Sequence, residues 1–244
     1  MFWLLSLAFW GFVALSSLVL FPIAVLIFCV TAPFDRRRAL LHRFTCFWAS
    51  LYTFLNPAWP VRIHGRERLH ESSPAVIVAN HLSLLDILVM FRLRSHFKWV
   101  SKQENFRVPL IGWNMTLCGY IPLRRGTTAS IATMMRLCNE ALTGGSSIVM
   151  FPEGTRSSTG RLRSFKPGAF DIAKRNGVPI QPIVLRGTGD ALPKSGFVLQ
   201  GRHPISIEIL DPIPPAEVDK YEAEEMMNRV RDSIAACLTR DPQG

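Results

Sequence analysis

The amino-acid sequence predicts an α/β domain with a mostly parallel central sheet flanked by helices, preceded by a hydrophobic helical segment. From residue 60 onward, short apolar runs typical of buried strands alternate with segments that carry helix start and stop signals. Because parallel strands need crossover helices, this alternation indicates a mostly parallel sheet. Long apolar runs dominate the chain before residue 60. We therefore expect membrane-anchoring helices over residues 1–59 and an α/β domain over residues 60–244.

The first element is an uncharged leader, because residues 1–34 contain no Asp, Glu, Lys or Arg. As a straight helix it would reach about 50 Å, more than the roughly 30 Å core of a bilayer. Either one tilted span exceeds the core, or the helix bends with Pro22 as the hinge. The sequence "DRRR" at 35–38 follows directly. Basic residues at the end of a membrane segment favour the cytoplasmic side, so we expect the following domain there.

The second element is the segment "ALLHRFTCFWASLYTFLNPAW" at 39–59, which interleaves aromatic and leucine residues with polar ones. This pattern predicts an amphipathic helix that ends near Asn56 and Pro57. Trp48, Tyr52 and Trp59 suit the headgroup level of a membrane. We favour an interfacial second helix of a membrane-anchoring hairpin over the alternative, a core helix of the soluble domain.

In the α/β part, residues that favour helix starts and stops flank the expected helices. Thr127 and Gly144 flank one helix, and Pro167 and Gly177 flank the next, at the positions where helices start and stop. The sequence predicts strands at 61–64, 75–79, 98–100, 119–122, 147–151, 180–185 and 205–210, and helices near 84–93, 127–143, 168–176 and 216–239.

Charge and cysteine content exclude several classes of function. The formal net charge is +10, and residues 35–216 carry 24 basic and 11 acidic side chains. A basic body behind an apolar leader suits an anionic lipid surface. Nucleic acid is the competing partner, but the chain carries no recognisable nucleic-acid-binding motif, so we expect none. The five cysteines are scattered and the histidines lack metal-ligand spacing, so we expect neither disulfides nor a metal site.

The stretch "VIVANHLSLLDILV" at 76–89 places polar residues inside an apolar run. His81 follows the expected strand, and Asp86 falls in the first turn of the expected helix, so the two side chains can converge. A neutral imidazole can take a proton from an alcohol, and a carboxylate on its other nitrogen fixes the tautomer. Ser83-x-x-Asp86 is also the pattern of a helix capping box, and His81 could be a satisfied polar residue at a strand end. This stretch alone leaves both interpretations open.

A second polar cluster, "MFPEGTRSSTGRLRSFKPG", follows another apolar strand and favours the catalytic interpretation. Gly154 allows close backbone approach, and the guanidinium of Arg156 suits a phosphate. The alternative is an ordinary basic surface loop. Arg124 and Lys102 also follow expected strands. Because the carboxyl ends of parallel strands share one edge, a His/Asp pair should face several cations, as a phosphorylated alcohol requires. The chain has no GxSxG elbow and no Walker loop.

These residues resemble the glycerolipid acyltransferase family, in particular its bacterial 1-acylglycerol-3-phosphate acyltransferases. "NHLSLLD" at 80–86 is similar to the family motif NHxSxxD, and "FPEGTRS" at 151–157 matches a second motif in full. "GYIPLR" at 119–124 and "VPIQPI" at 178–183 resemble two further motifs, with Pro122 and Gln181 in place of more apolar residues. The resemblance covers about residues 80–183, and the hydrophobic N-terminal segment is also similar to the family.

The resemblance implies transfer of a fatty acyl chain from acyl-CoA or acyl carrier protein to the sn-2 hydroxyl of 1-acylglycerol-3-phosphate, which gives phosphatidic acid. His81 would be the general base and Asp86 its orienting partner, with no metal, cofactor or prosthetic group. It also implies acceptor-binding roles for the following residues: Lys102, Arg124, Glu153, Gly154, Thr155 and Arg156.

Two alternatives remain at this point. The acceptor could be lyso-ornithine lipid or another lysophospholipid, because relatives with such substrates share these motifs. A non-enzyme alternative is a peripheral protein that binds anionic lipid without chemistry. For the enzyme, the implied location is the bacterial inner membrane with the catalytic domain facing the cytoplasm, and the implied partners are the lysophospholipid, the acyl donor and membrane lipid.

Overall fold

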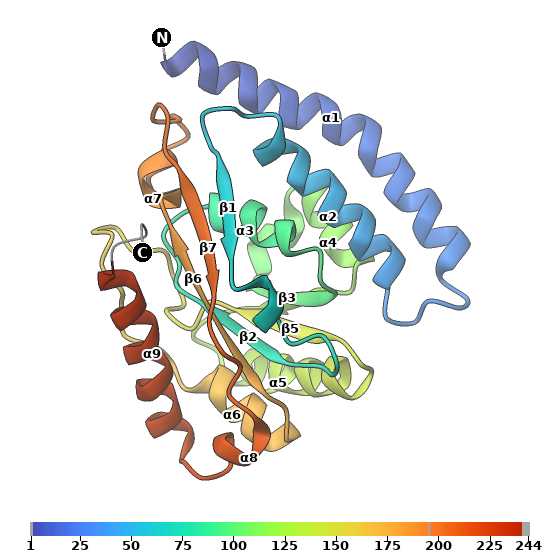
Figure 1. Cartoon of the computed structure of the whole chain (residues 1–244). Coiled ribbons are helices and arrows are strands. Elements are labelled where there is room, and N and C mark those ends of the chain that lie inside the picture. The colour runs from blue at the N-terminus through green and yellow to red at the C-terminus, as the bar shows by residue number, and fades with distance from the viewer. Residues whose placement is uncertain (1, 195, 241–244) are drawn as a thin grey trace.

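The computed structural model describes residues 2–194 and 196–240, and it has a seven-stranded sheet in the order β1-β7-β6-β2-β5-β3-β4 (Figure 1). The five strands from β6 to β4 run parallel, while β7 is antiparallel to β6 and parallel to β1. The predicted α/β fold with a mostly parallel sheet is therefore confirmed. The strands are β1 Val61–His64, β2 Val76–Ala79, β3 Phe97–Lys102, β4 Ile121–Leu123, β5 Ser147–Met150, β6 Ile180–Arg186 and β7 Ile205–Ile209.

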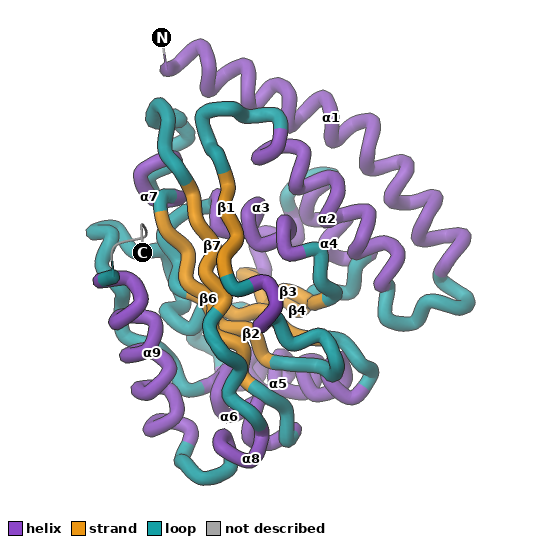
Figure 2. The backbone as a smooth tube through the Cα atoms, in the orientation of Figure 1, coloured by secondary structure: helices purple, strands orange, loops and turns teal. Residues whose placement is uncertain are grey.

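Helices cover both faces of this sheet, with α5, α6 and α9 on one side and α1 to α4 on the other (Figure 2). The strand side chains alternate between two apolar cores. Ile77 and Ala79 of β2 belong to the core under α2 and α3, whereas Val76 and Val78 belong to the core under α5 and α6. The helices are α1 Phe2–Thr31, α2 Ala39–Phe54, α3 Leu85–Met90, α4 Ile111–Leu117, α5 Thr128–Thr143, α6 Gly168–Asn176, α7 Thr188–Ala191, α8 Pro215–Val218 and α9 Ala223–Thr239.

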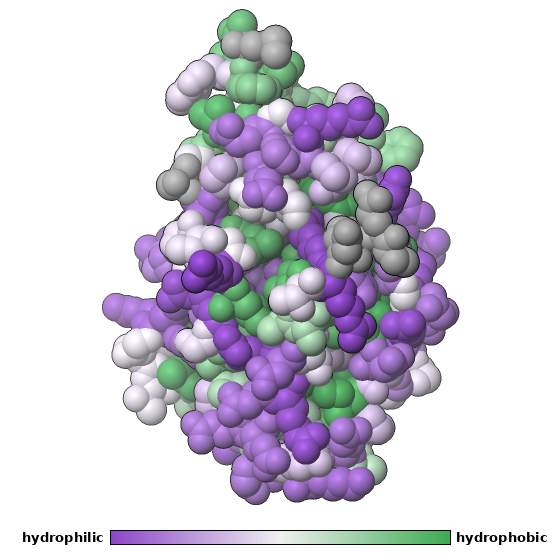
Figure 3. Space-filling view, turned by 60° about the vertical axis from the view of Figure 1, so that its left-hand side comes forward, coloured by the Kyte–Doolittle hydropathy of each residue, from purple (hydrophilic) through white to green (hydrophobic). Residues whose placement is uncertain are grey.

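The leader forms one long helix, α1, that continues through Pro22 without a break. It lies against the outside of α2 and α4, and Figure 1 shows it along the edge of the molecule. Figure 3 shows hydrophobic surface gathered at the end of the molecule where α1 begins. This apolar outer side is compatible with association with a membrane. The large apolar side chains that α1 exposes are Phe2, Trp3, Leu4, Leu5, Leu7, Phe12, Leu15, Leu18, Val19, Ile23, Leu26 and Val30.

The helix α2 differs from its prediction as an interfacial helix. It lies between α1 and the α/β body, and Trp48, Tyr52 and the following Trp59 are all buried rather than placed at a lipid headgroup level. Trp48 Nε1 donates a hydrogen bond to the Tyr52 hydroxyl, 2.6 Å away. The Tyr52 hydroxyl also lies 2.9 Å from Ser16 Oγ of α1. The polar tips that suit aromatic residues to a membrane interface are here satisfied by neighbouring protein groups.

Element boundaries differ from the predictions at several places. The expected helix at 216–239 is two helices, α8 and α9, because the backbone of Glu222 is extended between them. The expected helix at 84–93 ends as α3 at Met90 and continues as a short 3₁₀ turn. The expected strand at 119–122 is β4, two residues later at its start. Sequence analysis did not anticipate α4 and α7, which at seven and four residues are too short to show a periodic pattern.

Candidate active site

The polar clusters found in the sequence lie at one edge of the sheet. His81 follows β2 after a single residue, the segment 151–157 follows β5, Lys102 ends β3 and Arg124 follows β4. These four strands are parallel neighbours, so their carboxyl ends share the edge where α/β folds bind ligands. The predicted placement of these residues at one sheet edge is confirmed.

His81 and Asp86 form a hydrogen-bonded pair, with 2.8 Å between His81 Nδ1 and Asp86 Oδ2. Oδ2 also accepts hydrogen bonds from the main-chain N–H groups of Leu82 at 2.6 Å and Ser83 at 2.8 Å. The predicted convergence of the two side chains is therefore confirmed. The alternative interpretation as a helix cap is realised as well, because the Ser83 N–H contact is half of a capping box. One carboxylate both caps the turn and orients the imidazole.

The other oxygen of Asp86, Oδ1, accepts a hydrogen bond from the hydroxyl of Thr188 at 2.5 Å. Asp86 and Thr188 are both fully buried. The carboxylate thus has donors on both oxygens, which is the environment of an ionised carboxylate rather than a neutral acid. With Asp86 ionised, Nδ1 of His81 carries the proton and Nε2 keeps a free lone pair.

Aromatic stacking fixes the plane of the His81 ring. The imidazole lies parallel to the ring of Phe151, with 3.9 Å between centroids and 5° between planes. Phe151 in turn stacks on Trp99 of β3 with centroids 5.4 Å apart. The His81 side chain is 14% exposed, and no described residue forms a hydrogen bond to Nε2. The ring therefore offers Nε2 as an acceptor while its other contacts hold it in place.

Glu153 joins the two loops of the site. Its Oε1 accepts the main-chain N–H of His81 at 2.7 Å, and its Oε2 accepts the main-chain N–H of Arg163 at 3.0 Å. Burial raises the pKa of Glu153, and the two main-chain N–H donors partly offset that rise. The main-chain N–H of Ser157 donates to the His81 carbonyl at 2.8 Å, which is a second bond between the loops.

The remaining residues of the segment 151–157 form a turn that depends on glycine. Gly154 has a φ of +70°, and a Cβ there would lie 3.2 Å from Cε of Lys166. The Lys166 side chain thus passes over this turn, which places a cation beside it. Thr155 and Arg156 follow and are half-buried. The structure therefore brings Glu153, Gly154, Thr155 and Arg156 to the loop that contacts His81.

Lys102 and Arg124 lie farther along the same edge. Because β3 and β4 are the second and third strands from β2 in the sheet, their ends lie about 10 and 14 Å from the end of β2. The Lys102 ammonium pairs with Glu104 at 3.2 Å. Arg124 is exposed, and its main-chain N–H donates to Ser130 Oγ at 2.8 Å. These two side chains approach the pair less closely than the loop that bears Arg156.

Sequence analysis missed two residues of the site, Thr188 and Phe151. Thr188 follows Gly187 directly after the buried strand β6, so the rule that found His81 and Arg156 could have found it. Phe151 belongs to a motif that was identified, but its stacking on His81 depends on the spacing of β2 and β5 in the sheet. Among residues 2–194 and 196–240, no cluster of His, Cys, Asp and Glu side chains could hold a metal ion.

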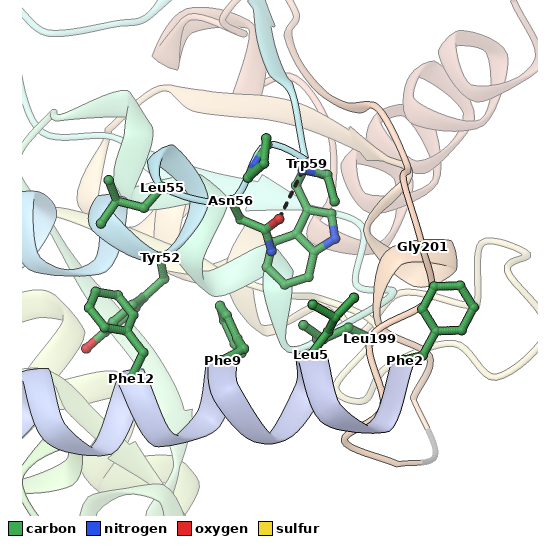
Figure 4. A pocket seen from close by; sticks show the side chains of 12 residues that line it. Phe2, Leu5, Phe9, Phe12, Tyr52, Leu55, Asn56, Trp59, Leu199 and Gly201 are labelled. Atoms are coloured by element: carbon green, nitrogen blue, oxygen red, sulfur yellow. Dashed lines mark hydrogen bonds between the residues drawn. The ribbon is translucent and has the colours of Figure 1, made fainter.

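An apolar pocket of about 360 Å³ lies at the same edge of the sheet, between α1 and the segments that precede β1 and β7 (Figure 4). Those segments reach this edge because β1 and β7 run opposite to β2. Figure 4 shows Phe9 and Phe12 of α1 pointing toward Tyr52 and Trp59 across the pocket. The main-chain N–H of Trp59 donates to the Asn56 carbonyl at 3.1 Å, which closes the turn at one end.

Comparison with known proteins identifies the family. The family model described as "Acyltransferase" matches residues 60–186, which include all of the site residues described above except Thr188. The chain belongs to this acyltransferase family. Its fold is also that of a solved structure, since the match to the crystal structure titled 1-acyl-sn-glycerophosphate (LPA) acyltransferase, PlsC, from Thermotoga maritima covers 100% of both chains. That likeness has a TM-score of 0.72 and 23% identity.

Curated relatives carry one recurring name. The chain is 38% identical over 203 residues to a chloroplastic 1-acyl-sn-glycerol-3-phosphate acyltransferase of Brassica napus, covering 82% of this chain and 58% of the relative. It is 36% identical over 233 residues to a 1-acyl-sn-glycerol-3-phosphate acyltransferase of Chlamydomonas reinhardtii, covering 94% of this chain and 67% of the relative. The chain spans a little over half the length, 58% and 56%, of the first two curated relatives it matches.

Proposed function

We propose that this chain transfers a fatty acyl group from acyl-CoA or acyl carrier protein to the sn-2 hydroxyl of 1-acylglycerol-3-phosphate, which gives phosphatidic acid. The observation that carries the proposal is the His81–Asp86 hydrogen bond of 2.8 Å at the sheet edge, with Nε2 left as an acceptor. The names of the relatives support the acceptor, because those proteins are called 1-acyl-sn-glycerol-3-phosphate acyltransferases.

In the proposed reaction, His81 Nε2 takes the proton of the acceptor hydroxyl as its oxygen attacks the thioester carbonyl carbon. Asp86 stabilises the imidazolium that forms. The tetrahedral intermediate then breaks its carbon–sulfur bond, and the leaving thiolate takes the proton from the imidazolium. The alcohol attacks the thioester directly, so the reaction needs no acyl-enzyme and no metal ion or cofactor.

The acceptor phosphate lies, in this proposal, against the turn that follows β5. Arg156 supplies the principal guanidinium because its loop contacts His81 through Glu153 and Ser157. Gly154 and Thr155 give that loop its shape, and Lys166 adds positive charge beside it. Arg124 and Lys102 extend the positive charge along the edge, where they attract the anionic headgroup over a longer range. Glu153 acts by holding the loop in place.

Both substrates carry acyl chains, and the apolar pocket beside α1 is a suitable place for one of them. We propose that α1 lies along the membrane surface rather than across the bilayer. It contacts the body at separate points, through Ser6 and Leu199 near its start and through Phe21 and Trp113 about two thirds of the way along. A helix packed in this way presents its apolar outer side to lipid while the site edge stays at the interface. The bacterial inner membrane, with its cytoplasmic face, remains our predicted location.

A lipid-extract assay tests the proposed function. The purified protein is incubated with a total lysolipid extract and labelled acyl-CoA or acylated carrier protein, and the labelled products are separated. Labelled phosphatidic acid is the expected result, and the more active donor identifies the thioester. A labelled ornithine lipid or another phospholipid as main product would show that the acceptor is lyso-ornithine lipid or another lysophospholipid instead. Salt-sensitive binding to anionic vesicles without any product would instead support a lipid-binding protein without chemistry.

A further inference from the structure

The segment that follows β6 approaches the site from the side opposite to the arginine loop. Gly187 has a φ of +79°, and a Cβ added to it would collide with the carbonyl oxygen of Pro204. This glycine turn starts α7 and directs Thr188 back toward the loop that follows β2. Gly189 packs directly on that loop, since a Cβ there would lie 3.3 Å from Cβ of Leu82.

Two hydrogen bonds hold α7 to the turn between His81 and Asp86. Thr188 Oγ1 donates to Asp86 Oδ1 at 2.5 Å, and Ser83 Oγ donates to the carbonyl of Leu192 at 2.6 Å. Ser83, Asp86 and Thr188 are all fully buried. The two bonds join segments more than 100 residues apart in the chain, one at each end of α7. The short helix is therefore fixed against the turn that carries Asp86.

We propose that Thr188 is a positioning residue, whose hydroxyl sets the rotation of the Asp86 carboxylate and through it the orientation of His81. The inference rests on the proposed function, because it assigns Thr188 a part in the acyl transfer of the same site. The main-chain donors and His81 all use Oδ2, so among the described residues only Thr188 holds Oδ1. Without that hydroxyl, Oδ1 is a buried acceptor with no donor, and the carboxylate can rotate about its Cβ–Cγ bond to find one.

Rotation of the carboxylate would change the direction in which Oδ2 meets His81 Nδ1. The stacking on Phe151 fixes the plane of the imidazole but not the position of its proton acceptor. A misaligned acceptor weakens the stabilisation of the imidazolium, which exists only during the reaction. The loss should therefore appear in kcat and leave KM nearly unchanged.

The experiment compares Thr188→Val, which keeps the shape and removes the hydroxyl, with Thr188→Ser, which keeps the hydroxyl. We expect Thr188→Val to lower kcat about tenfold or more with the acceptor KM within about twofold, since the lost hydrogen bond is to a charged group. Thr188→Ser should retain kcat within about threefold. The matched control is Thr53→Val, which removes another buried hydroxyl, one that donates to the Ser50 carbonyl at 3.1 Å in α2. This control should lose thermal stability and keep kcat.

A second measurement separates this inference from the proposed function. Histidine selectively labelled with ¹⁵N should show the His81 Nδ1 proton as a downfield signal, which is assigned by its absence in His81→Ala. We expect the signal in the wild type and in Thr188→Ser, and expect it to shift or vanish in Thr188→Val. The proposal requires both the loss of kcat and the change of signal, and either one unchanged in Thr188→Val overturns it. If the wild type itself transfers no acyl group, the proposed function fails, whereas a wild type that turns over beside an unchanged signal in Thr188→Val overturns only the role of Thr188.

Discussion

At the residue scale, separate contacts fix different parts of His81. Asp86 holds Nδ1, Phe151 holds the ring face, Glu153 holds the main-chain N–H and Ser157 binds the carbonyl. Because these contacts come from two parts of the chain, the start of α3 and the segment 151–157, the imidazole is oriented before any substrate arrives. Such preorganisation lowers the cost of reaching the transition state and is expected of a general base.

Arg156→Ala tests the assignment of the acceptor phosphate. Removing the guanidinium should raise the acceptor KM about tenfold or more, because hydrogen bonds to charged groups contribute about 1.5–3 kcal/mol. The KM for the acyl donor should stay within about twofold. Arg175→Ala, an exposed arginine on α6, is the matched control and should change neither constant. Steady-state kinetics with each substrate varied in turn provide the measurement, and an equal rise in both KM values would contradict a phosphate role.

The sequence was informative about the site where its residues are close in the chain. His81 and Asp86 are five positions apart, so their hydrogen bond followed from the expected turn between a strand and a helix. Glu153 and Thr188 contact the same turn from 72 and 102 residues away. Those contacts depend on the order of strands in the sheet, which the amino-acid pattern does not specify.

At the element scale, buried parallel strands were predictable because each is a short apolar run that ends at polar residues. The helix α2 was not, since aromatic residues with polar tips occur both in membrane interfaces and in protein cores. In this structure the polar side chain of His42 on α2 finds its hydrogen-bond partners in the α/β body. His42 Nδ1 lies 2.8 Å from the Tyr120 hydroxyl, and His42 Nε2 lies 3.0 Å from the Ser95 carbonyl oxygen.

We expect acid to weaken the contact between α2 and the body through His42. Burial, reinforced by the nearby His96, lowers the pKa of His42 to about 3 from the ordinary 6.5. Below pH 6.5 the unfolded chain therefore binds a proton that the folded chain does not. The free energy of unfolding should fall by about 1.4 kcal/mol per pH unit as the pH drops from 6.5 toward 3. His96, whose pKa burial lowers to about 4, acts in the same direction.

The measurement is denaturant unfolding in detergent at pH 7, 6, 5 and 4, followed by tryptophan fluorescence. His42→Gln should be less stable than the wild type at pH 7 and should lose less stability on acidification. His64→Gln, at an exposed histidine of β1, is the control and should follow the wild-type curve. Parallel pH dependence of the wild type and His42→Gln would contradict the assignment.

At the scale of the whole molecule, α1 is packed against the same α/β body that carries the site edge. The helix is bonded to the segment before β7, where Trp10 Nε1 donates to the Phe197 carbonyl at 2.7 Å. The hydrophobic leader was predictable from composition alone. Its packing along the body was not predictable, because a run of apolar residues is equally compatible with a helix that spans a membrane and with a helix that lies on a surface.

The double substitution Leu4→Lys with Leu15→Lys tests the membrane contact of α1. Both side chains are exposed, at 74% and 68%, and neither lines the apolar pocket. Burying each leucine in lipid contributes about 1.5–3 kcal/mol, so the variant should bind anionic vesicles at least about tenfold more weakly. Flotation with vesicles of phosphatidylglycerol and phosphatidylethanolamine measures the bound fraction. Ile131→Lys, which changes an exposed apolar residue on α5, should bind as the wild type does. Undiminished binding of the double variant would show that α1 does not face lipid.

The measurement that tests the central claim most directly is the turnover of His81→Ala and Asp86→Asn with labelled acyl donor and 1-acylglycerol-3-phosphate. The account predicts that loss of the general base lowers kcat by about 10² to 10⁴. Asp86→Asn should also lose most of its turnover, because an amide in place of the carboxylate no longer stabilises the imidazolium. Circular dichroism and vesicle binding should stay unchanged in His81→Ala. Turnover near the wild-type value in His81→Ala would show that the reaction does not pass through this imidazole.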